Sequence, residues 1–401
     1  MRPFTSTISL DEARQLLNAT VRPITRTDRI AIADAAGRVV AATVMSPIDV
    51  PAFDRALMDG YAVIAADTAA ATPASPAQLR LIDRVYTGQV GSVAVVPGTC
   101  AEIATGAPPP DGSDAVVMVE DTAANADHIL IRAAAAPGRN IGRRASDIRA
   151  GDEVVREGEV LRPSSVGALA AIGQPHVQVY AKPRVAILST GNEVVDPGTP
   201  LAAGQVYDVN RFTLGAIVDA HGGISQPHKV AQDTLGALER ALDACMEADL
   251  IVFSGGSSVG TRDLVTDLIA ARGEMIFHGV AVKPGKPTAL ARIGATPFFG
   301  MPGNPTSCLS NGYVLLLPFL RATARLPPYA PRLVRAPLGR RIASVAGRHQ
   351  FHTVRLREGI AYPAFKGSGE ITSLSQADGY IEIPAHRSEV GEGEEVEVTL
   401  F

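Results

Sequence analysis

The chain has 401 residues, of which 46% are hydrophobic and 19% are charged, and its formal net charge is −4. Because a single hydrophobic core stops growing well below this length, we expect roughly two to four domains. The composition excludes a disordered chain, and the net charge of −4 gives no electrostatic basis for nucleic-acid binding.

The N-terminal segment 1–17 lacks the apolar core of a signal peptide, and the sequence has no stretch of about 18 apolar residues. We therefore expect a cytoplasmic protein with no membrane partner. Cys100, Cys245 and Cys308 are widely separated, which favours neither a zinc site nor a disulfide framework. We interpret them as core residues in a reducing compartment.

The first structural signal is "SLDE" at residues 9–12, a capping box that predicts the start of a helix. From about residue 45 to residue 140, short β-branched runs alternate with Pro- and Gly-rich breaks, which predicts a small β domain. A basic cluster follows, and it is either a solvated turn or an anion contact. Its members are Arg139, Arg143, Arg144 and Arg149.

From residue 183 onward, apolar strands alternate with helical patterns, which predicts βαβ units and a mostly parallel sheet. Short strands return after about residue 328 and indicate a C-terminal β barrel or sandwich. The predicted fold class is a multi-domain α/β plus β protein. Its expected domains are 1–50 with 141–181, an inserted β domain 51–140, an α/β domain 182–327, and a C-terminal β domain 328–401.

Polar and glycine-rich connections follow the predicted strands of the α/β domain. They read "STGNEV", "QD", "SGGSSVGTRD", "KPGKP" and "GMPGNP". In open α/β sheets, ligands bind beyond the carboxyl ends of the strands, so these connections form the candidate binding site. Its candidate residues are Thr190, Gly191, Glu193, Asp233, Ser254, Gly255, Gly256, Ser258, Asp263, Lys283, Lys286, Pro302, Gly303, Asn304 and Pro305.

The chemistry of these connections suits a phosphorylated ligand with a divalent cation. Glycines let a phosphate approach backbone amides, and Lys283 and Lys286 add positive charge. Glu193, Asp233 and Asp263 would repel a phosphate unless a hard cation lay between them, which indicates Mg²⁺. The connection "GMPGNP" is expected to form a rigid floor and to direct the N-terminus of the following helix at an anion.

Each connection also has a simpler interpretation. "SGGSSVG" matches neither the Walker pattern nor the dinucleotide fingerprint and could be an ordinary turn. Asp233 could be a helix N-cap, and the two lysines could belong to a solvated turn. Outside this domain, Asp59 in "MDGYA" could belong to a plain hairpin, and Thr105 lies on a proline-rich loop.

Eight motifs of the sequence occur in the order and at the spacing of a known protein family. Among them are "SPIDVPAFDRALMDGYAV", "ATGAPPPDGSDAVVMVE", "VAILSTGNEV", "SGGSSVGTRD" and "GMPGNPTSC". In this, the sequence resembles the molybdopterin molybdenumtransferases, the MoeA and gephyrin E-domain family, from about residue 5 to residue 400. The resemblance implies a transferase of molybdenum cofactor biosynthesis. Such an enzyme takes adenylylated molybdopterin, with molybdate as co-substrate, and releases AMP after Mg²⁺-assisted cleavage of the pyrophosphate.

The resemblance also assigns roles to individual residues. It implies catalytic roles for Asp59, Glu193, Asp233 and Asp263, with Mg²⁺ held by Asp263 and Asp233. Thr105, Asp147, Lys283, Lys286, Pro302 and Pro305 match the family's substrate-binding positions. The family further implies a homodimer in which residues 1–50 with 141–181 form a linker and dimerisation domain. Asp59 and Thr105 are then expected to enter the site from the second subunit.

Several positions depart from the family pattern. Asn192 stands where the family commonly has Asp, and Thr353 stands where it has an arginine associated with molybdate. Losing that guanidinium should weaken molybdate binding by about 1.5 to 3 kcal/mol unless it is replaced. Arg355, two residues along the same strand face, is a candidate replacement, and Ser368 matches the family's hydroxyl at that site.

These departures leave other interpretations open. One is a molybdopterin-binding paralogue or scaffold with weak or no insertion activity. Another is an enzyme that prefers tungstate. A third is a generic nucleotide-dependent phosphohydrolase, which would not need the "MDGYA" element.

Overall fold

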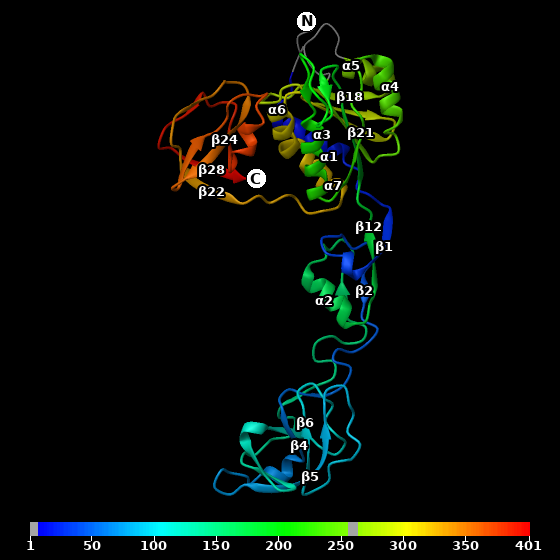
Figure 1. Cartoon of the computed structure of the whole chain (residues 1–401), viewed down its shortest axis with the longest axis vertical. Coiled ribbons are helices and arrows are strands. Elements are labelled where there is room, and N and C mark those ends of the chain that lie inside the picture. The colour runs from blue at the N-terminus through cyan, green and yellow to red at the C-terminus, as the bar shows by residue number, and fades with distance from the viewer. Residues whose placement is uncertain (1–6, 256–263) are drawn as a thin grey trace. The chain divides into compact units, whose positions relative to one another are not determined.

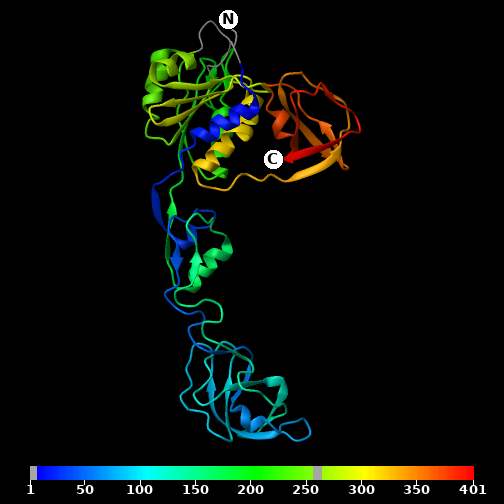
Figure 2. The same cartoon turned by 180° about the vertical axis from the view of Figure 1, so that it is seen from behind.

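The structure is a computed structural model that describes residues 7–255 and 264–401. The chain divides into two compact units (Figures 1 and 2). The first unit combines the residues up to Asp28 with Tyr180–Phe401, and the second is Arg29–Val179. Within the described ranges, no helix has both the length and the apolar character needed to cross a membrane.

The second unit contains a six-stranded sheet and a smaller part. The sheet runs β7 (Ala115–Met118), β4 (Gly60–Val63), β6 (Thr99–Ile103), β5 (Ala77–Val85), β9 (His128–Ile131) and β8 (Thr122–Asn125). The smaller part holds helix α2 (Pro163–Ala171) and two strand pairs, and a third pair packs against the six-stranded sheet. The two pairs are β1 (Thr27–Ala31) with β12 (His176–Tyr180) and β2 (Val44–Met45) with β11 (Glu153–Val155), and the third is β3 (Arg55–Ala56) with β10 (Ile141–Gly142).

The first unit is built around a six-stranded sheet. Its order is β16 (Ile224–Pro227), β13 (Arg184–Ser189), β17 (Leu250–Ser254), β21 (Thr296–Met301), β20 (Ala289–Ile293) and β18 (Glu274–His278). The pairs from β16 to β21 are parallel, and β20 is antiparallel to both of its neighbours. The central strands are buried on both faces, as the continuous apolar runs predict.

Helices cover both faces of this sheet (Figure 1). One face packs against α1 (Leu10–Thr20), α3 (Asn210–Ala220), α6 (Pro305–Asn311), a π-helical turn (Gly312–Leu316) and α7 (Leu317–Thr323). The other face packs against α4 (Leu235–Asp243) and α5 (Leu264–Arg272).

Helix α1 begins as the capping box predicts, because the Ser9 hydroxyl accepts a hydrogen bond from the Glu12 amide at 3.1 Å. Its buried residues Leu10, Ala13 and Leu17 belong to the core of the α/β sheet. The sequence alone placed this segment in the separate domain of residues 1–50. The spacing of its apolar residues predicts a buried face but not the surface that this face contacts.

A second sheet of the first unit lies in the C-terminal region. It runs β19 (Val282–Lys283), β24 (His349–Arg357), β26 (Gly379–Ile383), β28 (Glu395–Leu400) and β22 (Leu333–Pro337), with β25 (Ile360–Pro363) on β24. The short elements β14 (Val194–Val195), β15 (Val206–Tyr207), β23 (Ile342–Ala343), β27 (Glu389–Val390) and α8 (Thr372–Ser375) complete the unit. The predicted multi-domain α/β plus β class is confirmed at this level.

Candidate functional site

The registers of the α/β sheet place the ends of its strands at one edge. Ser189, the last residue of β13, pairs with Ser254 of β17, which in turn pairs with Met301 of β21. One residue earlier, Gly300 pairs with Ala289 at the start of β20, and Ala289 pairs with His278 at the end of β18. The connections that follow residues 189, 254, 278 and 301 therefore all leave the sheet at the same edge, which we call the strand-end edge.

Two carboxylates lie beside the first of these connections. The Thr190 hydroxyl donates to Asp233 Oδ1 at 2.5 Å, so the two connections after β13 and β16 are joined. The Glu193 carboxylate folds over Gly191, where an added Cβ would lie 3.0 Å from both carboxylate oxygens. Gly191 has a φ of +151°, which residues with a side chain rarely adopt. Asp233 and Glu193 thus flank the Thr190–Gly191 step.

Asp233 is not the cap of the helix that follows it. Thr234 occupies the N-cap position of α4, and its hydroxyl accepts from the Ala237 amide at 3.4 Å. The Asp233 carboxylate is instead held by Thr190. The N-cap interpretation of Asp233 is therefore excluded, and the half-buried carboxylate remains at the strand-end edge.

The connections after β17 and β21 pack against each other through a residue to which the sequence analysis assigned no role. Asn210 is only 8% exposed, and its Nδ2 donates to Ser254 Oγ at 2.7 Å and to the Gly303 carbonyl at 2.8 Å. Gly255 is required here because its φ is +105° and an added Cβ would lie 2.3 Å from the Thr190 carbonyl oxygen. The signal for Asn210 was its place in "YDVNRF", at the start of a predicted helix.

A buried charge pair lies next to the end of β13 at the same edge. The Asp208 carboxylate accepts from the Ser189 hydroxyl at 2.9 Å, and it lies 3.3 Å from Arg211 Nε. Next to it, burial raises the pKa of the Cys308 thiol to about 12. The Cys308 sulfur lies 3.6 Å from Ser254 Oγ and remains protonated at neutral pH, so it is not a nucleophile.

The loop "PGNP" contacts the C-terminal region of the same unit. Asn304 Nδ2 donates to Ser368 Oγ at 3.2 Å, and the Thr306 amide donates to the Ser368 carbonyl at 3.0 Å. The Thr306 hydroxyl also donates to the Glu370 carbonyl at 2.7 Å. An amide in the first turn of α6, expected to point at an anion, is therefore bonded to a carbonyl of the chain itself. The same contacts bring Ser368 to the strand-end edge.

The lysine turn is held rigidly. Gly285 lies between Lys283 and Lys286 with a φ of +101°, and its carbonyl accepts from Asn311 Nδ2 at 2.8 Å and from the Thr288 hydroxyl at 3.0 Å. Both lysines are half-buried. The turn is thus ordered and packed rather than freely solvated. Lys283 also belongs to β19 and so joins the turn to the C-terminal sheet.

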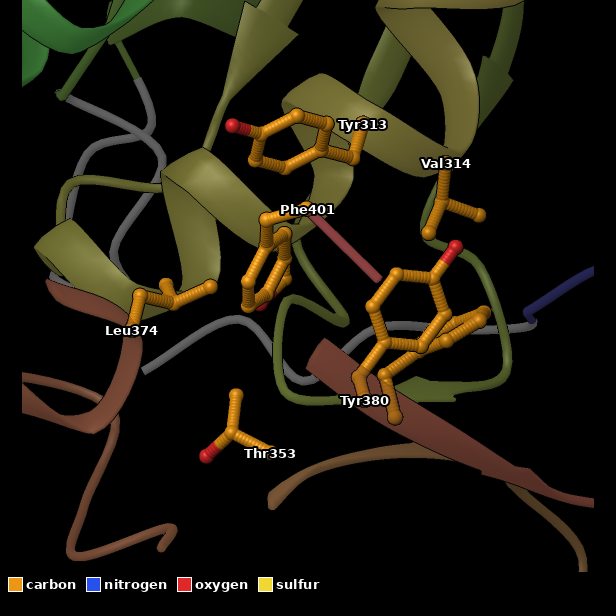
Figure 3. Close-up of a pocket in the computed structure, with 8 residues that line it drawn as sticks. Tyr313, Val314, Thr353, Leu374, Tyr380 and Phe401 are labelled. Atoms are coloured by element: carbon orange, nitrogen blue, oxygen red, sulfur yellow. The ribbon is translucent and has the colours of Figure 1, made fainter. Parts of the chain in front are cut away.

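Thr353 lies in a small pocket lined by Ser310, Tyr313, Val314, Phe351, Leu374, Tyr380 and Phe401 (Figure 3). Its side chain is 2% exposed, and among the described residues its hydroxyl has no hydrogen-bond partner. Arg355 does not line this pocket, because its guanidinium donates to the carbonyl and the side-chain oxygen of Gln376. Of the two expected molybdate residues, Ser368 is bonded to Asn304 at the strand-end edge, whereas Arg355 is bonded to Gln376 of the C-terminal region.

In the second unit, the structure brings Asp59 and Thr105 together. The Thr105 amide donates to Asp59 Oδ1 at 2.8 Å. Gly60 is required beside Asp59 because an added Cβ would lie 1.9 Å from the Val117 carbonyl oxygen. Asp147 is exposed and not in this pair, and its amide donates to the Val50 carbonyl at 3.0 Å.

The basic cluster of the second unit is largely neutralised by carboxylates. Arg143 pairs with Asp54 at 2.7 Å, and Arg144 pairs with Asp49 at 2.6 Å. Hydrogen bonds from the Ala150 amide and from Arg144 lower the pKa of Asp49. These pairs organise the turn and reduce the positive charge available to an anion.

Three predicted site residues, Gly256, Ser258 and Asp263, lie outside the described residues. Within the described ranges, no group of three or more His, Cys, Asp or Glu side chains could hold a metal ion by itself. A metal at the strand-end edge would therefore need oxygens from the ligand or from further residues, in addition to Asp233 and Glu193.

Three family models match successive parts of the chain. They are described as "MoeA N-terminal region (domain I and II)" over residues 8–173, "Probable molybdopterin binding domain" over residues 186–322, and "MoeA C-terminal region (domain IV)" over residues 335–401.

Known proteins resemble the chain over almost its whole length. Molybdopterin molybdenumtransferase 2 of Mycobacterium tuberculosis is 36% identical over 94% of this chain and 95% of its own. The molybdopterin molybdenumtransferase of Haemophilus influenzae is 31% identical over 98% of both chains. Among solved structures, a molybdopterin biosynthesis MoeA protein of Pyrococcus horikoshii is similar with a TM-score of 0.81 and 30% identity, covering 99% of this chain and 100% of that chain.

Proposed function

This chain belongs to the MoeA family of molybdenum cofactor biosynthesis, and we propose that it acts as a molybdopterin molybdenumtransferase. In the proposed reaction, adenylylated molybdopterin and molybdate bind at the strand-end edge. Water attacks the pyrophosphate link, which breaks to release AMP. The two sulfurs of the dithiolene then replace two oxygens of molybdate, which leave as water.

The observation that carries this proposal is the convergence of the connections at one edge of the sheet. Thr190, Ser254 and Gly303 are linked there by direct hydrogen bonds or through Asn210. The lysine turn between β18 and β20 leaves the sheet at the same edge. Glycine-lined backbone with two lysines suits a diphosphate, because amides and ammonium groups both donate to phosphate oxygens.

The donor set also fits Mg²⁺. Asp233 and Glu193 supply hard carboxylate oxygens beside the Thr190–Gly191 step. Mg²⁺ is usually bound by one or two carboxylates together with substrate phosphates rather than by a complete protein cage. When bound, it would neutralise charge that develops on the phosphate oxygens during cleavage. Asp263 remains a proposed ligand from the sequence.

The chain's own residues have separable roles in this proposal. Lys283 and Lys286 attract and orient the diphosphate, and the rigid Gly285 turn fixes where their stems begin. Thr190 holds Asp233 in place through its hydroxyl. Ser368, bonded to Asn304, places a hydroxyl from the C-terminal region where an oxyanion such as molybdate can be bound.

We further propose a homodimer in which Asp59 and Thr105 of a second copy complete the site. The Asp59 loop exposes Phe53, Leu57 and Met58, with 48%, 47% and 43% of their surfaces accessible. Exposed apolar side chains gathered around one carboxylate are typical of a surface that another protein covers.

The experiment that tests the proposed function follows AMP release from adenylylated molybdopterin with Mg²⁺ and molybdate. The unaltered chain should release AMP, and Asp233→Asn should slow release on the order of 10²-fold, because one of the carboxylates that would hold Mg²⁺ against the phosphate is lost. Asp11→Asn, at an exposed helix position, is the matched control and should be unchanged. Tungstate in place of molybdate tests metal preference in the same assay.

A second candidate function is a scaffold that binds molybdopterin without inserting metal. It is favoured by Thr353, which stands where the family has an arginine associated with molybdate and whose buried hydroxyl has no partner among the described residues. If the chain binds the substrate but releases no AMP at any molybdate concentration, the enzymatic proposal is contradicted and the scaffold is supported.

A further inference from the structure

Asn192 follows β13 and is fixed in one orientation. The Asp233 amide donates to Asn192 Oδ1 at 3.2 Å. A backbone N–H can only donate, so the acceptor must be the side-chain oxygen and not the nitrogen. The carboxamide therefore presents its Nδ2, with two hydrogen-bond donors, away from the Asp233 backbone.

These two donors are available to a ligand. Within the part of the chain that the structure describes, no residue accepts a hydrogen bond from Asn192 Nδ2, and the side chain is exposed. Asn192 lies between Gly191 and Glu193 and is bonded to Asp233, so its immediate neighbours are two carboxylates. Its carboxamide is a neutral donor placed directly beside these carboxylates.

The charge balance of this connection determines what Nδ2 can contribute. The carboxylates of Glu193 and Asp233 repel a diphosphate unless a cation lies between them. A carboxamide N–H attracts a phosphate oxygen directly and needs no cation. Lys283 and Lys286, on the turn between β18 and β20, also attract phosphate oxygens without a cation.

We propose that Asn192 is a phosphate-binding residue whose Nδ2 donates to the diphosphate of the substrate, so that part of the diphosphate affinity of this chain is independent of Mg²⁺. The proposal rests on the proposed function for the identity of the ligand. It goes beyond that function by assigning a metal-independent contact to a residue between the two carboxylates.

The test is calorimetric titration of the full chain with inorganic pyrophosphate, first with EDTA and then with Mg²⁺. Asn192→Asp keeps an oxygen acceptor for the Asp233 amide but replaces the donor by a negative oxygen. It should weaken metal-free binding roughly 10- to 100-fold, the effect of losing a hydrogen bond to a charged group. With Mg²⁺ the loss should shrink, because the new carboxylate also attracts the cation.

Asn192→Ala removes the donor without adding charge and should weaken binding about equally with and without Mg²⁺. Asn125→Asp, an exposed position in the β8 strand of the second unit, is the matched control for added charge and should bind as the unaltered chain does. Thermal unfolding of each variant checks that the fold is retained.

The inference is overturned if Asn192→Ala binds metal-free pyrophosphate like the unaltered chain, whatever Asn192→Asp does, or if the unaltered chain binds none without metal. A chain that binds pyrophosphate through Asn192 but releases no AMP contradicts the proposed function instead. The two failures are therefore distinguishable.

Discussion

Thr353 shows how one residue can be tested apart from the reaction. Its hydroxyl is buried without a partner in the described structure, so it contributes a desolvation cost and no hydrogen bond. Thr353→Val, which has nearly the same shape, should leave the free energy of unfolding unchanged or raise it by about 1 kcal/mol in chemical denaturation.

Thr288→Val is the matched control, because the Thr288 hydroxyl is buried and donates to the Gly285 carbonyl at 3.0 Å. This variant should lose about 1 to 3 kcal/mol. Equal losses at the two positions would show that Thr353 has a partner after all.

His352, the neighbour of Thr353, should make stability depend on pH. Burial, with a smaller contribution from Lys283, lowers its pKa from 6.5 to about 4. The unfolded chain therefore binds this proton more readily than the folded chain between pH 6.5 and pH 4, and stability should fall as pH decreases through that window.

His352→Phe keeps an aromatic ring beside Phe365, since the centroids of the two native rings lie 5.2 Å apart. Between pH 7 and pH 4.5, the free energy of unfolding of this variant should fall by about 2 kcal/mol less than that of the unaltered chain. Denaturant titrations at several pH values measure this slope. An unchanged slope in the variant would contradict a buried neutral His352.

At the scale of elements, the lysine turn depends on Gly285. An added Cβ there would lie 2.3 Å from Asn311 Nδ2, and the φ of +101° is unfavourable for alanine. Gly285→Ala should therefore destabilise the chain by more than 2 kcal/mol and raise KM for the substrate, because both lysines are displaced.

Gly294→Ala is the control for backbone strain alone. Gly294 has a φ of +60° but no atom within 4 Å of an added Cβ, so this variant should lose only about 1 kcal/mol and keep its KM. If the two variants behave alike, the packing of Asn311 does not position the turn.

The elements that the sequence predicts best are those with long, regular patterns. Alternating apolar strands and helices predict the α/β sheet, and the strand-end rule identifies the connections that the registers bring to one edge. The hydrogen bond between Thr105 and Asp59 is consistent with two motifs that the family resemblance placed in one site.

The sequence could not predict features that depend on distant partners. β19 has only two residues, too few for a periodic signal, yet it pairs with β24 of the C-terminal sheet. The Thr306 amide is bonded to Ser368, 62 positions along the chain, and no local pattern indicates this contact. The role of Asn210 could not be predicted either, because its two partners, the Ser254 hydroxyl and the Gly303 carbonyl, are 44 and 93 positions away along the chain.

At the scale of the whole molecule, the first unit joins an α/β sheet and a C-terminal sheet through specific contacts. Strand β19 connects the lysine turn to the C-terminal sheet. The hydrogen bonds from Asn304 and Thr306 to Ser368 connect the loop "PGNP" to the same region. The proposed diphosphate and molybdate positions are therefore parts of one connected structure. In the proposed reaction, this connection would place a C-terminal hydroxyl beside a ligand at the strand-end edge.

The most direct test of this account is a crystal structure of the chain with AMP, Mg²⁺ and molybdate. The account predicts that the phosphate of AMP lies at the strand-end edge, within hydrogen-bond distance of the connections that carry Thr190, Ser254 or Gly303. An ordered AMP whose phosphate lies elsewhere, with this edge free of ligand, would contradict it.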